Sequence, residues 1–316
     1  MPSAGTDHLN ASSLPLVRLR LAKLASHLVV ALIALVVIGG ATRVMEAGLA
    51  CPDWPLCYGS LLPGRQMNVQ VFLEWFHRLD AFLVGIAFLL QFLIALFFRS
   101  KLPQWLIWVY ASGLFLVVIQ GLLGGVTVLG LLPSTVVTAH LALALTLVAL
   151  MSAVSQRLLQ VRSSPAPKWW LWLGGSSLGV VIFQCLLGGR MATTWSSKRC
   201  LGQGENCQLL DFHMISAMPV CLLILIFVGT SVVSGGWPRS QWPLLSLAFL
   251  LVIFQIALGI TSVHLGLSEP LITVAHQLIA AILVASLAAL SFRRPNDSRS
   301  IISDQFDESL LEACHG

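Results

Sequence analysis

Residues 21–41, LAKLASHLVVALIALVVIGGA, form an almost unbroken apolar stretch. About 20 apolar residues in a helix cross the hydrocarbon core of a bilayer, so this stretch predicts a transmembrane helix. Seven similar stretches follow, at about 71–98, 104–126, 135–156, 169–190, 210–232, 243–264 and 271–292. Helices are predicted because lipid leaves no water for unpaired backbone groups. No stretch alternates apolar and polar residues as the strands of a membrane barrel do. The predicted fold class is all-α: a polytopic membrane protein with eight transmembrane helices.

The composition and the charge distribution agree with this class. Only 10% of the 316 residues are charged and 57% are hydrophobic, whereas soluble domains carry about 25% charged residues. With eight spans both termini share one side, and five basic residues face the other side: Arg43, Arg65, Arg190, Lys198 and Arg199. Arg78 lies within a span, which leaves twelve of the 18 Lys and Arg residues on the side of the termini.

This excess places both termini in the cytoplasm by the positive-inside rule. The net charge of +5 is therefore a matter of topology, and no nucleic-acid partner is expected. The membrane expected is a prokaryotic plasma membrane. Polar residues 1–17 and 293–316 are predicted to be inner tails, and 1–17 lack the features of a signal peptide.

An internal repeat divides the chain. Gly39-Gly40 recurs as Gly188-Gly189 and Cys51 as Cys200, both at an offset of 149. The motif Gln120-Gly-Leu-Leu-Gly124 recurs as Gln184-Cys-Leu-Leu-Gly188 and as Gln255-Ile-Ala-Leu-Gly259. We predict two repeated four-helix bundles, 18–156 and 169–292, joined by an inner linker at 157–168. Four spans per half make this a parallel repeat, which is one of the two kinds found in transport proteins.

Two pairs of cysteines lie in loops on the outer side. Cys51 and Cys57 share the first outer loop, and Cys200 and Cys207 share the third. That side is usually oxidising, and turn-forming residues between the cysteines allow each short loop to close. Two disulfides are one interpretation, and free thiols without a role are the other.

Four histidines fall near the outer ends of helices. His77 and His140 belong to the first half, and His213 and His276 follow them at an offset of 136. Ionisable groups buried in a membrane are candidates for function because burial is costly. Zinc would need further ligands, whereas haem takes axial ligands and fits the interior of a bundle. Two histidines per half therefore favour one haem per half, and ordinary helix-end histidines bonded to carbonyls are the alternative.

The two halves differ beside these histidines. Glu74 lies one helical turn before His77, and its match at an offset of 136 is Leu210; Arg78 likewise matches Met214. A carboxylate here is able to act as a general acid or base, and Arg78 and Arg43 suit haem propionates. A Glu74–Arg pair that only fixes the first helix against the second is the alternative. The chemistry is expected in the first half, and a structural or electron-transfer haem in the second.

Three motifs resemble the haem A synthase family: Gly39-Gly-Ala-Thr-Arg43, Gly48-Leu-Ala-Cys51-Pro-Asp-Trp-Pro-Leu-Cys57 and Glu74-Trp-Phe-His77-Arg78. The similarity covers about residues 18–292. It implies an oxidoreductase that converts the C8 methyl of haem O to the formyl of haem A for terminal oxidases. Its substrate haem would lie between His77 and His140 with Glu74 needed for activity, and haem b between His213 and His276. Disulfides Cys51–Cys57 and Cys200–Cys207 are also implied.

Other classes compete with this interpretation. A di-haem cytochrome b-type protein that transfers electrons from quinol would use four histidines equally well but has no need of Glu74. A disulfide-exchange protein needs a reactive thiol, and these loops contain no Cys-x-x-Cys. A haem or small-molecule transporter is the third alternative. Only a synthase changes the identity of its haem; haem O synthase and terminal oxidase subunits are its expected partners, and its electron donor is not indicated.

Overall fold

The computed structural model describes residues 7–159, 164–205 and 207–295. Within them the chain forms ten helices and no strand, with one isolated bridge between Cys57 and Ser60. The helices are α1 (Asp7–Val44), α2 (Val69–Phe97), α3 (Gln104–Leu129), α4 (Ser134–Leu159), α5 (Lys168–Thr193), α6 (Ser196–Gln203), α7 (Gln208–Val233), α8 (Gly236–Ser240), α9 (Trp242–His264) and α10 (Pro270–Phe292). The predicted all-α class is confirmed.

Eight of these helices are long and apolar enough to cross a membrane, namely α1 to α5, α7, α9 and α10. They match the eight predicted stretches, and prolines mark several of their starts: α9 and α10 carry one at their first or second position, where the missing N–H is no loss. Many large apolar side chains remain exposed on their outer faces, as lipid contact requires. The chain is an integral membrane protein.

The helix ends differ from the sequence-based boundaries in two places. The first helix begins at Asp7, so it extends into the predicted tail, and its membrane-crossing part is Leu16–Val44. The short helix α6 follows Trp195 and precedes Gly204, and both of these residues have left-handed backbone conformations. Helices α6 and α8 were not predicted, because neither is long enough to show a helical period in its apolar residues. Residues 1–6, 160–163 and 296–316, parts of the predicted tails and linker, lie outside the described residues.

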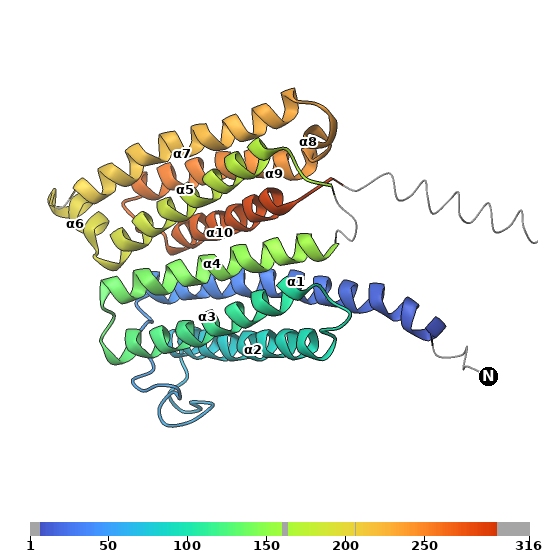
Figure 1. Ribbon diagram of the computed structural model, residues 1–316. Coiled ribbons are helices and arrows are strands. Elements are labelled where there is room, and N and C mark those ends of the chain that lie inside the picture. The colour runs from blue at the N-terminus through green and yellow to red at the C-terminus, as the bar shows by residue number, and fades with distance from the viewer. Residues whose placement is uncertain (1–6, 160–163, 206, 296–316) are drawn as a thin grey trace, which may run out of the picture.

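The helices contact one another in two groups of four. In the first, α1 touches α2 and α4, and α3 touches the same two helices; in the second, α5 and α9 each touch α7 and α10. Figure 1 shows the first group, in blue and green, beside the second, in yellow to red. The groups meet where α10 packs on α1 and α4, and where α4 packs on α5. Each group has the same order of neighbours, although its description as one repeated bundle stays a prediction.

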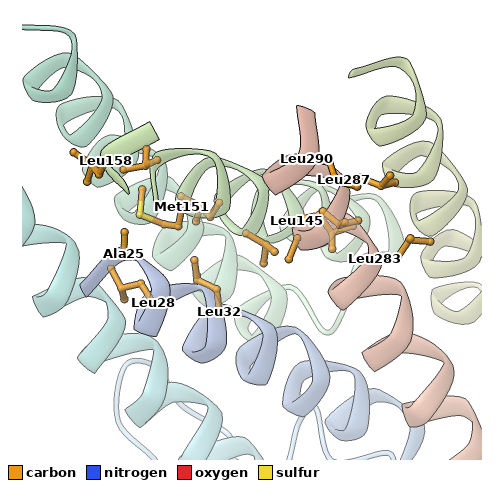
Figure 2. Close-up of a cluster of buried hydrophobic side chains, with 14 of the residues drawn as sticks. Ala25, Leu28, Leu32, Leu145, Met151, Leu158, Leu283, Leu287 and Leu290 are labelled. Carbon is orange, nitrogen blue, oxygen red and sulfur yellow. The ribbon is translucent and has the colours of Figure 1, made fainter. Parts of the chain in front are cut away.

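The buried core runs along the boundary between the groups. Figure 2 shows leucine, alanine and methionine side chains from α1, α4 and α10 packed together, among them Ala25, Met151 and Leu287. Ser152 on α4 donates a hydrogen bond of 2.6 Å to the backbone oxygen of Ala285 on α10. Small residues and such side-chain bonds allow helices to approach closely where lipid provides no hydrophobic drive. Helices α4 and α10 therefore hold the two groups together.

The two cysteine loops lie at one end of the helices, and the described chain ends lie at the other (Figure 1). At that other end Arg18 donates to the backbone oxygens of Leu158 and Arg157, at 2.9 and 3.1 Å. Arg293 bonds the side-chain oxygens of Gln156 and Gln241, at 2.9 and 2.7 Å, and burial lowers the pKa of its guanidinium. Basic side chains thus join the helices at the end that carries the termini.

Candidate functional site

The four candidate histidines occupy comparable places near helix starts. His77 is eight residues beyond the start of α2 at Val69, His140 six beyond Ser134, His213 five beyond Gln208 and His276 six beyond Pro270. At about 1.5 Å per residue, all four lie roughly 8–12 Å along their helices. These helices all start at the end of the molecule that carries the cysteine loops (Figure 1).

Each histidine packs its ring against a glycine of the preceding long helix. A Cβ built on Gly39 would lie 3.1 Å from Cε1 of His77, and one on Gly188 would lie 3.1 Å from Cε1 of His213. The corresponding distance is 3.5 Å from Gly124 to His140 and 3.2 Å from Gly259 to His276. The missing side chains let each imidazole lie directly on a neighbouring helix backbone.

The histidines divide between the two groups of helices. His77 and His140 belong to the first group, and His213 and His276 belong to the second. Among the described residues, Nδ1 of His77, His140 and His276 is buried without a hydrogen-bond partner. No three His, Cys, Asp or Glu side chains gather there to hold a bare metal ion, as far as the described ranges extend. Paired imidazoles in glycine-lined surroundings fit a haem better than zinc.

In the second half, the neighbours of the pair are neutral. Nε2 of Gln184 lies 3.2 Å from Nδ1 of His213 and 2.6 Å from its backbone oxygen, and Ser216 donates to Oε1 of Gln184 at 2.7 Å. Nε2 of Gln255 lies 3.0 Å from Nε2 of His276. Leu210, the match of Glu74, is buried. Nothing charged touches these imidazoles in the described structure.

In the first half, Glu74 forms a buried ion pair. Its side chain is on α2, and Oε1 lies 2.6 Å from a guanidinium nitrogen of Arg78. Its other oxygen, Oε2, accepts a hydrogen bond of 2.8 Å from the backbone N–H of Cys51. The whole residue is only 5% exposed. Both oxygens of this buried side chain therefore have a hydrogen-bond partner.

Arg78 extends this contact along the outer loop. Its guanidinium donates to the backbone oxygens of Asp53, Leu56 and Cys51. The same loop also contacts α3, because a Cβ built on Gly125 would lie 3.1 Å from Cδ2 of the Trp54 ring. We call residues 51–57 with their contacts to Glu74 and Arg78 the loop clasp. The Glu74–Arg78 pair thus exists, but it fixes the outer loop over α2 instead of fixing α1 against α2.

Both disulfides are present. Cys51 bonds Cys57, and Cys200 bonds Cys207, each with Cα atoms 4.8 Å apart. Just after the first ring, the backbone amides of Gly59 and Tyr58 donate to Asp53, which lies inside the ring, at 2.7 Å each. They hold the pKa of its carboxyl below the usual value. The free-thiol interpretation of these two pairs is wrong for this structure.

Arg43 reaches the other group of helices. It donates to the backbone oxygens of Ala192 and Thr193 at the end of α5, and its guanidinium lies 4.0 Å from the centre of the Trp195 ring. Carbonyls at a helix C-terminus attract cations. In the opposite direction, Arg190 donates to Ser134 at the start of α4, at 2.8 Å. The two arginines therefore join the groups at the end of the cysteine loops, a role that their sequence context did not indicate.

A second set of glycines also connects the groups. A Cβ on Gly40 would overlap the side chain of Gln277, and one on Gly189 would come within 2.5 Å of Leu141. Gln277 directly follows His276, and Leu141 directly follows His140. In each Gly-Gly pair, the first glycine contacts a histidine of its own group, while the second contacts the neighbour of a histidine in the other group.

Eight membrane-crossing helices with two glycine-lined histidine pairs define a polytopic membrane protein suited to porphyrin ligands. A family model described as cytochrome oxidase assembly protein, COX15-CtaA, matches residues 22–288. The chain belongs to this COX15-CtaA family of cytochrome oxidase assembly proteins.

Proteins named heme A synthase are among its relatives. The one from Shewanella oneidensis is 28% identical over 316 aligned residues, which cover 81% of this chain and 91% of that protein. The one from Azorhizobium caulinodans is 27% identical, with 88% and 94% covered. The one from Caulobacter sp. (strain K31) is 32% identical over 194 residues, with 50% and 56% covered.

Proposed function

We propose that this protein is a haem A synthase, an oxidoreductase that converts the C8 methyl group of haem O to a formyl group for the assembly of a terminal oxidase. Relatives with this name align over most of both chains. The structural observation that carries the proposal is the asymmetry of two similar histidine pairs. Among the described residues, a buried carboxylate shares a helix with one of these histidines only in the first half, where Glu74 and His77 both lie on α2.

In this proposal the first half binds the substrate. His77 and His140 supply the two imidazoles, and Gly39 and Gly124 let the Cε1 atom of each ring come close to a neighbouring helix backbone. Successive hydroxylations of a methyl group lead to a geminal diol that loses water to give the aldehyde. The loss of water moves a proton from one hydroxyl of the diol to the other, which departs as water, and Glu74 is the carboxylate that we assign to accept or position protons at the reacting group. Its contact with the N–H of Cys51 keeps water away from its outer side.

The second half holds a resident haem b between His213 and His276. Three observations support this fit. Nδ1 of His276 has no hydrogen-bond partner and Nδ1 of His213 contacts only an amide. Gly188 and Gly259 leave space beside the rings, and no charged side chain touches the rings in the described residues. Haem b, when bound, would carry electrons one at a time. The protein's part is to orient the rings and to exclude water from a low-dielectric site. Leu210 and Met214 supply no proton-transfer group.

Arg43 and Arg78 are the proposed partners of haem propionates. Arg43 now binds the carbonyls of Ala192 and Thr193, and Arg78 binds Glu74 and three loop carbonyls. A propionate would replace carbonyl acceptors by a charged one, which forms a stronger hydrogen bond with a guanidinium. In this proposal, substrate binding therefore loosens the loop clasp.

The proposed arrangement is two repeated four-helix bundles, 18–156 and 169–292, in a prokaryotic plasma membrane with both termini in the cytoplasm. The histidines and disulfides would then lie toward the outer, oxidising side. Haem O synthase and terminal oxidase subunits are the partners that would supply the substrate and take the product. The names of the relatives favour this function over a di-haem quinol electron-transfer protein.

The test is to express the chain in a host that makes haem O but no haem A. Extracted, non-covalently bound haems are then identified by chromatography and mass. We expect a formyl-bearing haem, and we expect it to disappear in His77→Ala while a b-type haem is still bound. Bound haem without conversion, in membranes supplied with a working respiratory donor, would favour the electron-transfer class. A protein that binds no haem at all would overturn the assignment of the four histidines.

A further inference from the structure

Three arginines from three different helices lie at one level, near the end of the molecule that carries the termini. Arg18 is two residues inside the membrane-crossing part of α1, Arg157 is two residues before the last residue of α4, and Arg293 directly follows α10. These ends of α1, α4 and α10 lie away from the cysteine loops (Figure 1). The apolar spans end at this level, so the three residues are placed where the headgroups of a bilayer begin.

Hydrogen bonds gather the three arginines around the last turn of α4. Arg18 donates to the backbone oxygens of Leu158 and Arg157, at 2.9 and 3.1 Å. Arg293 donates to the side-chain oxygen of Gln156 at 2.9 Å. Helix α4 contacts both α1 and α10 at the boundary between the two groups of helices. Arg18, Arg157 and Arg293 therefore form one cluster at the end of that boundary, which we call the arginine cluster.

No described carboxylate lies near Arg157 or Arg293. In the ranges 16–159, 164–205 and 207–295, every acidic residue lies at the end of the cysteine loops or in the half of α2 nearer to them: Glu46, Asp53, Glu74, Asp80, Glu205, Asp211 and Glu269. The C-terminus of a helix attracts cations, but it carries only about half a negative charge. The end of α4 therefore balances only part of the charge of the two guanidiniums.

One atom of Arg157 points to a missing acceptor. Its Nη1 nitrogen is buried, yet it has no hydrogen-bond partner among the described residues. A buried donor without an acceptor is destabilising, and more so when it is charged. Arg157 and Arg293 are only half-buried as whole residues, so a molecule at the membrane surface is able to reach them. A guanidinium presents its N–H groups as a planar fork that suits the oxygens of a phosphate.

We propose that the arginine cluster binds the phosphate group of an anionic phospholipid, in the leaflet at the end of the termini. Phospholipid headgroups present phosphates at this level, and basic pockets between transmembrane helices bind such headgroups. The bound phosphate gives Nη1 of Arg157 its acceptor and joins α1, α4 and α10 where the two groups of helices meet. The site is distinct from the two histidine pairs, which lie toward the other end of the helices, and it does not depend on the proposed function.

The first experiment compares two lipids. The full-length protein, as purified, is reconstituted in nanodiscs of phosphatidylcholine with or without phosphatidylglycerol, and its thermal unfolding is followed. We expect phosphatidylglycerol to raise the unfolding temperature by about 5 °C when the lipid is present at about a hundred times its dissociation constant. Native mass spectrometry of the detergent-purified protein should detect retained phosphatidylglycerol. The same unfolding temperature in both lipids would overturn the proposal.

The variant Arg157→Gln separates lipid binding from folding. Because Nη1 has no partner among the described residues, the substitution should not lower the unfolding temperature in phosphatidylcholine. We expect its affinity for phosphatidylglycerol to fall about fivefold, the factor for one basic residue near an anionic surface. Arg99→Gln is the control, because Arg99 is exposed between α2 and α3 at the same end of the molecule. It loses the same charge and should keep the full rise in unfolding temperature.

Two other occupants would give different results. If inorganic phosphate at matched ionic strength stabilises the detergent-purified wild type as much as phosphatidylglycerol does, the site takes free phosphate and the lipid assignment is wrong. The other occupant is the acidic tail of this chain, which contains Asp304, Asp307 and Glu308. If Arg157→Gln and a full-length variant with these three residues neutralised both unfold at a lower temperature in phosphatidylcholine alone, the tail binds the arginine cluster and the proposal is wrong.

Discussion

Around His213 and His276 the neighbours are amides, a hydroxyl and a leucine, whereas the helix that carries His77 also carries a carboxylate, a guanidinium and their attachment to a disulfide-closed loop. The glycine beneath each ring is the same in both regions. The two regions therefore share a backbone arrangement beside the histidines and differ in a few side chains around them. In the proposed function, the second region holds a ligand and the first acts on one.

The largest expected effect comes from neutralising Glu74. Glu74→Gln keeps the shape and still accepts from the N–H of Cys51, while Arg78 retains its carbonyl acceptors. We expect conversion of haem O to fall by about 10²–10⁴-fold, the range for loss of a general acid or base, with both histidine pairs still able to bind haem. Leu210→Gln, which puts the same amide in the second half, is the control. Normal conversion in Glu74→Gln would remove the catalytic assignment.

The second prediction separates the histidine pairs. His276→Ala should lose its b-type haem, with an affinity loss above the roughly 10–100-fold typical of second-shell changes. His140→Ala should keep that haem and lose haem O binding. The haem-to-protein ratio and the identity of the extracted haem report both. The comparison breaks down if the two variants lose the same haem.

The third prediction compares the two disulfides. A double serine variant at Cys51 and Cys57 opens the loop clasp, and one at Cys200 and Cys207 opens the loop that contains α6. Closing such short loops stabilises the folded protein by about 2–3 kcal/mol in the chain-entropy model. The temperature of thermal unfolding should therefore fall by a similar amount in both variants. Conversion should fall much further in the first variant, up to about a hundredfold, because only that loop contacts Glu74. Equal activities would mean that the loop clasp does not affect the site.

The smallest expected effect concerns Asp53. Since its folded pKa is depressed by the amides of Gly59 and Tyr58, its stabilisation of the turn is present above about pH 3.9, the unfolded value, and is lost as the pH falls toward the folded value. Asp53→Asn should lose the charged acceptor at every pH. Hydrogen exchange at the amides of Tyr58 and Gly59 measures this. Unchanged protection in Asp53→Asn at pH 7 would show that the charge is irrelevant.

Most of the fold was available from the sequence, because a bilayer makes helix length and apolar composition almost sufficient. The eight spans were found within a few residues of their ends. The start of α1 at Asp7 was missed, since polar residues before a span give no hydropathy signal. The short helices α6 and α8 were missed for the opposite reason: five to eight residues are too few to show a period.

The site was predictable where repeats amplify the signal. The shared offset of 136 identified all four histidines, and the loop cysteines were identified by their spacing. Individual contacts were not predictable: Glu74 to the N–H of Cys51, Trp54 on Gly125, and Arg43 across to Trp195. Each joins residues from different elements, so only the three-dimensional path of the outer loop and α5 brings them together. The motif Gln-x-x-x-Gly was visible, yet its meaning required seeing which ring lies on each glycine.

The second glycine of each Gly-Gly pair has a consequence for the way this molecule is assembled. Gly40 receives Gln277, and Gly189 receives Leu141, so the wall behind the last histidine helix of each group is supplied by the other group. Neither group is a finished unit when its own four helices have inserted. During synthesis the first group would keep one flank incomplete until α5 packs against α4 and until α10, the last helix of the described residues, packs against α1 and α4. Helix α10 brings Gln277 to Gly40, whereas Leu141 meets Gly189 as soon as α5 has inserted. A chain truncated before α10 would therefore lack His276 and the part of the first group's surroundings that α10 supplies.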